Sequence, residues 1–244
     1  AGFVYDTIPL GIIVTEDIIV TVCLQENEVL NEFTNGAYRS FYTFKKTRFL
    51  LQILFATATQ YLKYLKQVDK QSNEIEKKLH SSMRNEELEK LLNLEKSLVY
   101  FNTSLRSNEI VMEKLLRSQL LKETPVLETV ERVLKLYEED RDLLEDVITE
   151  NKQAIEMANI YANILSNTMD AFASIISNNL NIVMKFLTSV TIVLALPTML
   201  ASFYGMNVKL PLAGLPYAFY IVLAMSLVIS VVAVVFLAKR KMFF

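Results

Sequence analysis

The chain has 244 residues, of which 52% are hydrophobic and 21% are charged. This composition is too apolar for an ordinary soluble domain and too charged for a protein that lies wholly inside a membrane. All 27 carboxylates and 20 of the 25 lysines and arginines lie in residues 1–170, which gives that part a formal charge of −7. Residues 171–244 hold five cations and no acid, so the sequence predicts a solvated part followed by a membrane part.

The chain has one cysteine, Cys23, and one histidine, His80. These counts exclude a disulfide within the chain and a zinc site built from cysteine and histidine. We interpret Cys23 as a small buried strand residue, and we expect His80, which lies among charged residues, to be exposed. The chain begins at Ala1 without a methionine or a secretory leader, so we expect part of the natural N terminus to be missing.

Residues 1–46 begin with a segment rich in valine, isoleucine and threonine, which is typical of short strands. We predict strands at Gly11–Val14 and Ile19–Leu24, joined by a turn at residues 15–17. Two strands alone are marginally stable, so residues 1–46 are interpreted as the remnant of a larger α/β domain. The pair at residues 35–36, Asn-Gly, is a turn or a helix-stop signal.

Long helices are predicted next, because no glycine occurs between Gly36 and Gly205 and only two prolines interrupt that stretch. Glycine and proline are the residues that most often end local structure. We therefore predict a helical hairpin over residues 47–125, with its break near residues 80–85.

Pro125 marks the next boundary, because the residue before a proline avoids the α region and proline suits the first turn of a helix. From residue 126 nothing interrupts a helix before Pro197. Apolar residues recur along this stretch at alternating steps of three and four, which is typical of a helix with neighbours along its length. We predict a stalk helix over residues 126–182 that continues into the membrane.

Two apolar runs near the C terminus, Phe186–Phe203 and Tyr217–Leu237, contain no charged residue. Each has about the 20 residues that a helix needs to cross the hydrocarbon core. We predict transmembrane helices at residues 183–204 and 217–238, joined by an outer loop at residues 205–216. The predicted fold is a mainly α membrane protein whose very long helix is both stalk and first span.

The orientation of the two spans follows from the cations beside them. The tail at residues 239–244 holds three cations, whereas the loop holds only Lys209. The positive-inside rule places the tail in the cytoplasm, so both termini are expected there and the loop outside. Lys185, at the inner end of the first span, can extend to the interface.

Small polar residues follow one face of the long helix. Steps of four and three residues lead from Asn163 to Ser202, and ten of the twelve positions on this face are polar. Such a stripe is typical of close helix packing, of hydroxyls bonded to their own backbone, or of a pore lined by several copies. The candidate pore-lining residues are Asp170, Ser174, Ser177, Asn181, Thr188, Thr191, Thr198 and Ser202.

The stripe and the loop predict a gate and a filter. Met184 on the stripe and the adjacent Leu187 predict a hydrophobic constriction that gates by loss of water. The outer loop begins with Gly205, Met206 and Asn207, and no acid is near. Because Mg²⁺ keeps several of its waters, the Asn207 carboxamide can hydrogen-bond to a hydrated ion, and Gly205 lets backbone carbonyls approach it.

Gly205-Met206-Asn207, at the tip of a two-span hairpin and ahead of a basic end, resembles the CorA family of divalent-cation transporters. The resemblance covers about residues 40–244. It implies a homopentameric funnel in a bacterial plasma membrane that moves hydrated Mg²⁺ down its electrochemical gradient and closes when cytoplasmic Mg²⁺ binds. It also implies a basic collar at Lys239, Arg240 and Lys241.

The resemblance further implies that Asp170 forms a ring at the inner vestibule and that Asp146 supplies one side of a regulatory Mg²⁺ site between subunits. Asp146 is equally well interpreted as a solvated charge in the acidic stretch 138–146. The loop departs from many relatives because it has no acid and contains Lys209. Met206 and the scarcity of histidine favour Mg²⁺ over Zn²⁺, with Co²⁺ or Ni²⁺ as surrogates.

Two other functions fit parts of the sequence. A two-span receptor would need a sizeable outer domain, and a coiled-coil signalling protein or tether leaves the filter motif unexplained. No catalytic constellation and no glycine-rich phosphate loop is present, so neither an enzyme nor an organic cofactor is expected. The expected partners are further copies of the chain, the lipid bilayer and hydrated divalent cations, with Mg²⁺ both transported and regulatory, and no nucleic acid.

Overall fold

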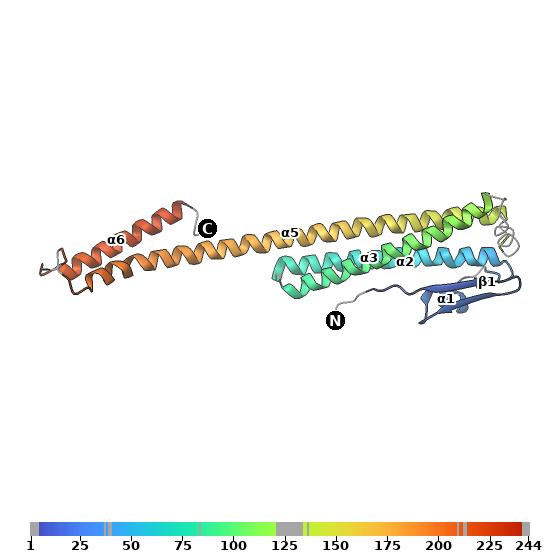
Figure 1. Ribbon diagram of the computed structural model, residues 1–244, viewed down its shortest axis with the longest axis horizontal. Helices are drawn as coiled ribbons and strands as arrows, with labels where there is room; N and C mark the ends of the chain where they lie inside the picture. The colour runs from blue at the N-terminus through green and yellow to red at the C-terminus, as the bar shows by residue number, and fades with distance from the viewer. Residues whose placement is uncertain are drawn as a thin grey trace. The chain divides into compact units, whose positions relative to one another are not determined.

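The computed structural model of the chain is mainly helical, with a two-stranded sheet near the N terminus (Figure 1). The chain divides into two compact units, Ala1–Met169 and Asp170–Phe244, which are described in turn. The structure describes residues 5–36, 38, 41–82, 84–120, 134–135, 137–208, 210–211 and 214–240. Its elements are β1 (Leu10–Val14), β2 (Ile19–Cys23), α1 (Glu28–Thr34), α2 (Lys46–Ser82), α3 (Asn85–Leu120), α5 (Glu138–Tyr204) and α6 (Ala218–Lys239).

The strands β1 and β2 pair antiparallel, with Ile12 opposite Thr21. A backbone hydrogen bond of 2.9 Å from Thr15 N to Ile18 O closes the turn between them. The two strands therefore lie within one residue of the predicted positions. Cys23 is half-buried at the end of β2, whereas a buried position was predicted.

The short helix α1 was not predicted from the sequence. Its N-cap is Asn27, whose side chain accepts hydrogen bonds from the backbone N–H groups of Val29 (2.9 Å) and Leu30 (3.4 Å). The helix ends at the predicted stop signal, where Gly36 adopts a φ of 71°. This left-handed conformation suits glycine and leads the chain out of the helix.

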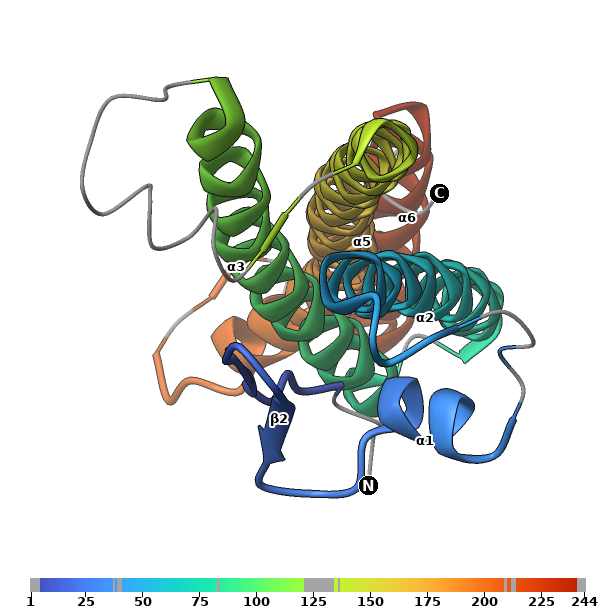
Figure 2. The same ribbon diagram turned by 90° about the vertical axis from the view of Figure 1, so that its right-hand side faces the viewer.

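The helices α2 and α3 form the predicted antiparallel hairpin, and the break between them lies at residues 83–84. Figure 2 views α2, α3 and the first part of α5 nearly end-on, with the β1–β2 hairpin and α1 on the side away from α5. One buried cluster joins the three helices, and a second joins α1 to α2. The first consists of Leu51, Met112, Leu144 and Val147, and the second of Val29, Phe33, Ile53 and Ala56.

The long helix α5 begins at Glu138, so the prediction that it starts directly after Pro125 is wrong. Residues 134, 135 and 137 lie outside any helix, and residues 121–133 lie outside the described part of the chain. The start has a local cause. Asp140 is 4% exposed, and its carboxylate accepts a hydrogen bond of 3.3 Å from the backbone N–H of Tyr137. This bond and the backbone bond from Asp140 N to Tyr137 O (3.0 Å) fix the first turn, and Arg48 lies 3.5 Å from the same carboxylate.

In the second unit, α5 continues past Pro197 to Tyr204 without interruption. A proline inside a helix removes one backbone donor, which neighbouring groups can compensate in a membrane span. The helix α6 begins and ends one residue after the predicted span at 217–238. Both helices are long and apolar enough to cross a membrane.

Candidate ion-conduction path

The predicted filter lies where α5 ends. The backbone N–H of Gly205 donates to the carbonyls of Ala201 (3.0 Å) and Ser202 (3.2 Å), and that of Met206 donates to the carbonyl of Phe203 (3.3 Å). These bonds form a tight last turn immediately before Asn207. The Asn207 side chain is exposed and has no hydrogen bond to another described residue, so its carboxamide is available to a ligand.

Gly205 is not required by the fold of a single chain. A Cβ atom built at this position would lie 3.5 Å from the carbonyl oxygens of Ala201 and Ser202, which is ordinary van der Waals contact. Its φ is not in the left-handed region, since Gly36 alone among the described glycines has a positive φ. Any need for glycine at this position therefore arises from what approaches the helix end from outside the chain.

The outer loop is tied back to α5 by a contact that the sequence analysis did not foresee. The phenol of Tyr204 donates a hydrogen bond of 3.3 Å to the carbonyl of Pro211. On the α6 side, Ala218 N donates to Leu215 O at 3.1 Å. The sequence signal that could have indicated this bond is a tyrosine directly before the filter motif, followed seven residues later by a proline.

An open groove of about 770 Å³ lies between the end of α5 and the start of α6. Its walls carry both small and large side chains from the two helices, among them Ala201, Ala218 and Phe219, and Tyr204 and Gly205 also line it. Thr198 borders this groove as well as belonging to the predicted stripe. Part of the stripe therefore faces the groove beside α6.

The predicted stripe is exposed along its whole length in the second unit. All eight candidate pore-lining residues, from Asp170 to Ser202, are exposed. The less exposed positions between residues 188 and 202 form another set, Ser189, Val190, Val193, Leu196, Pro197 and Leu200. At about 100° per residue, the two sets lie on roughly opposite faces of α5. The stripe is therefore the more exposed side of the span, although Thr198 also borders the groove beside α6.

Two threonines of the stripe are bonded to their own helix. Thr191 Oγ1 donates to the carbonyl of Leu187 and Thr198 Oγ1 donates to that of Leu194, both at 2.8 Å. This geometry is one of the predicted explanations of the stripe. It also commits each hydroxyl proton to the backbone, so the exposed lone pairs of the oxygen can only accept hydrogen bonds.

The two predicted gate residues are large, apolar and exposed. Met184 is 53% exposed and Leu187 is 56% exposed. They lie near the N-terminal end of the apolar run, before the threonines along α5. In a single chain they pack on little, so a constriction requires apolar side chains from further copies.

The acidic candidates do not form a metal site within one chain. Asp146 and Asp170 are both exposed on α5. The described ranges contain no group of three or more His, Cys, Asp or Glu side chains placed to hold a metal ion. Each carboxylate therefore needs a partner from outside the described chain if it is to bind an ion.

The predicted collar lies at the end of α6. Lys239 is its last residue, and the guanidinium of Arg240 lies over the ring of Phe236 at 5.7 Å. Lys241, the third predicted collar residue, lies outside the described residues. Lys239 and Arg240 are exposed.

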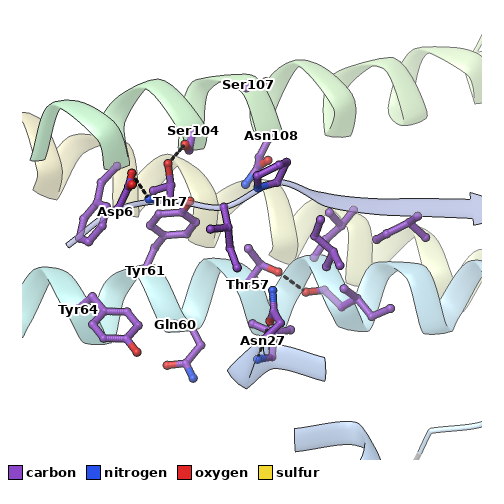
Figure 3. Close-up of a pocket in the computed structure, with 18 residues that line it drawn as sticks. Asp6, Thr7, Asn27, Thr57, Gln60, Tyr61, Tyr64, Ser104, Ser107 and Asn108 are labelled. Carbon is purple, nitrogen blue, oxygen red and sulfur yellow. Dashed lines mark hydrogen bonds between the residues drawn. The ribbon is translucent and has the colours of Figure 1, made fainter. Parts of the chain in front are cut away.

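A second cavity, of about 520 Å³, lies in the first unit between the segment before β1 and the helices α2 and α3 (Figure 3). In the figure, Ser104 reaches down from α3 to Thr7, and the hydroxyl of Ser104 donates to that of Thr7 at 2.9 Å. Asp6 is the one carboxylate that lines it. The rest of the lining as described is hydroxyls, amides, aromatic rings and aliphatic side chains, which suits the anchoring of the N-terminal segment and offers no acid–base pair for catalysis.

A sequence model described as CorA-like Mg²⁺ transporter protein matches residues 3–240. The chain belongs to the CorA family. A cobalt/magnesium transport protein CorA from Methanocaldococcus jannaschii is 30% identical over 238 residues, which cover 93% of this chain and 69% of the relative. One from Thermotoga maritima is 27% identical over 199 residues, which cover 81% of this chain and 53% of the relative.

A solved structure supports the same assignment of the fold. The complete CorA magnesium transporter from Methanocaldococcus jannaschii matches with a TM-score of 0.71 and 28% identity, over 94% of this chain and 74% of that chain. The predicted family and the mainly α membrane fold with its N-terminal sheet remnant are confirmed. Membership of the CorA family favours a transporter over the two alternative functions, a two-span receptor and a coiled-coil signalling protein.

Proposed function

We propose that this CorA-family chain assembles with further copies, five in all, into a channel that moves hydrated Mg²⁺ down its electrochemical gradient. The observation that carries the proposal is the free polar face of α5. The stripe from Asp170 to Ser202 is exposed, while the opposite face of the span is partly covered. Two spans cannot enclose a path, so the stripe finds its function when several copies meet around an axis.

The chemistry of the stripe suits a hydrated cation. The waters around Mg²⁺ point their hydrogens outward, so the pore wall has to accept hydrogen bonds rather than donate them. Thr191 and Thr198 meet this requirement, because their protons are bonded to backbone carbonyls at 2.8 Å. The Asn207 carboxamide oxygen adds an acceptor at the outer mouth. Mg²⁺ gives up its waters reluctantly, so neutral acceptors avoid the cost of stripping them, and Co²⁺ or Ni²⁺ are expected surrogates.

Met184 and Leu187 form the proposed gate. Rings of these two side chains would make a narrow apolar collar below the threonines. Water leaves such a collar when it is narrow enough, and a hydrated ion then cannot pass. Widening the collar by a small rotation of α5 in each copy opens the path.

The proposed regulation acts through carboxylates on the same helix. Asp146 and Asp170 are exposed on α5, one in each unit. Cytoplasmic Mg²⁺ bound between copies at such carboxylates would hold the helices in the closed arrangement. Residues 1–182 are then the cytoplasmic regulatory part, and both termini lie in the cytoplasm beneath the plasma membrane of a bacterium.

The experiment that tests the filter is Asn207→Ala, assayed by Mg²⁺ entry into liposomes that contain the purified chain and a fluorescent indicator. Each hydrogen bond lost in the ring is worth about 1 kcal/mol, so uptake is expected to fall at least tenfold, as an order-of-magnitude estimate. Asn179→Ala is the matched control, because Asn179 is exposed on α5 on the side opposite the stripe. Equal uptake by the wild type and the Asn207 variant would remove the filter from this position.

A further inference from the structure

The buried face of α5 in the first unit changes character along its length. Its positions follow alternating steps of four and three residues, which is typical of a continuous seam between packed helices. They are Asp140, Leu144, Val147, Asn151, Ala154, Ala158, the half-buried Tyr161 and Leu165. At the start of this seam, Leu144 and Val147 pack against Leu51 of α2 and Met112 of α3. Large side chains that interlock in this way fix how far one helix lies along another.

The next part of the seam lacks such interlocking. Beyond Val147, the next three positions are Asn151, Ala154 and Ala158, over about 16 Å of helix, with Ile155 buried at the flank. Alanine carries a single methyl group and inserts no large side chain between those of a facing helix. A shift of α5 by four residues would bring Ala158 to the site of Ala154 with the same small side chain. The apolar packing of this stretch therefore specifies the axial register weakly.

Two asparagine contacts join α5 to α3 over the same stretch. Asn151 is fully buried, and its Nδ2 donates a hydrogen bond of 3.0 Å to the carbonyl of Leu105. Further along α5, Asn159 accepts a hydrogen bond from the amide of Asn102. The Asn102 carbonyl oxygen in turn accepts from Arg106 Nε at 2.7 Å. Unlike methyl groups, these donors and acceptors meet their partners at one axial position, so the amides define the register that the alanines leave open.

Asn151 weakens the seam in which it lies. Its Oδ1 is buried and has no hydrogen-bond partner among the described residues, and an unpaired buried acceptor costs free energy that an apolar side chain avoids. The amide also opposes a shift of the helix. Moving Asn151 by four residues, to the site of Val147, would bury it in the apolar cluster with Leu51 and Met112. It would lose the carbonyl of its α3 partner there, and the shifted register is therefore penalised.

We propose that Asn151 and the Asn102–Asn159 pair form an amide latch that holds α5 at one axial register against α3. The latch lies within the first unit, and it depends neither on the assembly of copies nor on the transported ion. A single buried asparagine in a helical seam is known to fix register at a cost in stability. Because α5 continues unbroken into the first span, the latch is, under the proposed function, also the place where the α2–α3 hairpin holds the pore helix.

The test measures the distance between α3 and α5 in the full chain. Spin labels are attached at Thr103→Cys on α3 and Glu156→Cys on α5, two exposed positions. The one native cysteine is removed by Cys23→Ser. Labelled chain is diluted with unlabelled chain in nanodiscs, so that double electron–electron resonance reports distances within one copy. The chain with an intact latch is expected to give one narrow distance distribution.

Asn151→Leu is expected to broaden this distribution or to add a second distance, because the seam then lacks the amide that penalises the shifted register. A shift by four residues moves the α5 label by about 6 Å along the helix. The thermal midpoint of unfolding is expected to rise by about 2–4 °C, because an apolar side chain replaces the unpaired acceptor. A residue with a purely structural role gives the opposite result, a lower midpoint and an unchanged distance.

Two further variants separate the amide from side-chain volume and from surface effects. Asn151→Ala removes the amide without adding volume, and it is expected to broaden the distribution as Asn151→Leu does. Gln153→Leu is the matched control, because it removes an exposed amide two residues away on the same helix. This control is expected to keep the narrow distribution.

The proposal is overturned if both Asn151 variants keep the single narrow distance, or if Gln153→Leu broadens it equally. It is also overturned if the larger leucine alone changes the distance, because overpacking then explains the change. Failure of both Asn151 variants to fold overturns it too, because the amide is then required for folding and does not select a register. Mg²⁺ uptake is measured in parallel. A chain that shows the expected distances but no uptake contradicts the channel and not the latch.

Discussion

At the scale of single residues, the C-terminal end of α5 combines a polar side chain that has no hydrogen bond to another described residue with a glycine that the fold of one chain does not need. Asn207 is exposed beside Gly205, whose missing Cβ would make only ordinary contacts at 3.5 Å. A position that tolerates a side chain within one copy can be intolerant once several copies meet. The requirement for Gly205 is therefore expected to appear in transport and not in folding.

The substitution Gly205→Ala tests this distinction. The free energy of unfolding of the chain is expected to change by less than about 1 kcal/mol, because the added methyl group fits. Mg²⁺ uptake into liposomes is expected to fall, because methyl groups from every copy would crowd the outer mouth. Thermal unfolding and uptake are measured on the same preparation, and a variant that is destabilised as strongly as it is inactivated would place the need for glycine inside the chain.

In the threonines of the stripe, the helix backbone fixes the hydroxyl as a hydrogen-bond acceptor. In water a threonine donates and accepts equally well. In α5 the bonds from Thr191 and Thr198 to the preceding turn remove the donor and leave an acceptor. In the helix, a side chain that could both donate and accept hydrogen bonds can therefore only accept them from outside. An acceptor suits the outward-facing hydrogens of a hydrated cation.

At the scale of elements, the start of α5 depends on one carboxylate. Asp140 accepts from the Tyr137 backbone N–H at 3.3 Å and lies 3.5 Å from the Arg48 guanidinium of α2. It therefore caps α5 and links it to α2. Thr47 adds a second link, since its hydroxyl donates to the carbonyl of Lys135 at 2.9 Å.

Asp140→Ala is expected to lower the free energy of unfolding of the first unit by about 1–2 kcal/mol, which is the usual cost of losing a helix cap. The measurement is chemical denaturation followed by circular dichroism. Asp142→Ala, two residues away and exposed, is the control and is expected to change stability little. Equal effects of the two variants would show that the acidic stretch acts through its overall charge.

At the scale of the whole molecule, the proposed regulation depends on copies meeting through α5. Asp146 is exposed, and the described chain brings no cluster of ligands to it. A regulatory ion would therefore have to be shared with another copy. Binding between copies couples the ion concentration to the arrangement of the long helices, which is the requirement for gating.

The substitution Asp146→Lys tests this regulation. With a cation in place of a ligand, internal Mg²⁺ is expected to inhibit uptake only at concentrations at least about fivefold higher. The matched control is Asp142→Lys, one turn earlier in the same acidic stretch. If both variants are inhibited as the wild type is, Asp146 is a solvated charge, the second interpretation that its sequence context allows.

Much of the helical architecture could be predicted from the sequence, because long helices are decided by local rules. The scarcity of glycine and proline between Gly36 and Gly205 predicts α2 and α3, and two uncharged apolar runs predict the spans. The motif at residues 205–207 led to the family. The helix α1 was missed because seven residues capped by Asn27 leave too short a pattern to recognise.

The features that the sequence by itself determined are those in which each residue acts through its neighbours along the chain, namely helix propensity, apolar length and the separation of charge at Asp170. The tertiary structure alone decided where α5 begins, that the Tyr204 hydroxyl donates to the carbonyl of Pro211, and which side of α5 is partly covered. Each of these depends on atoms that are brought together by folding, and neither periodicity nor composition records such contacts. The polar stripe is visible in the sequence, but only the structure shows that it is exposed while the opposite side of the span is partly covered.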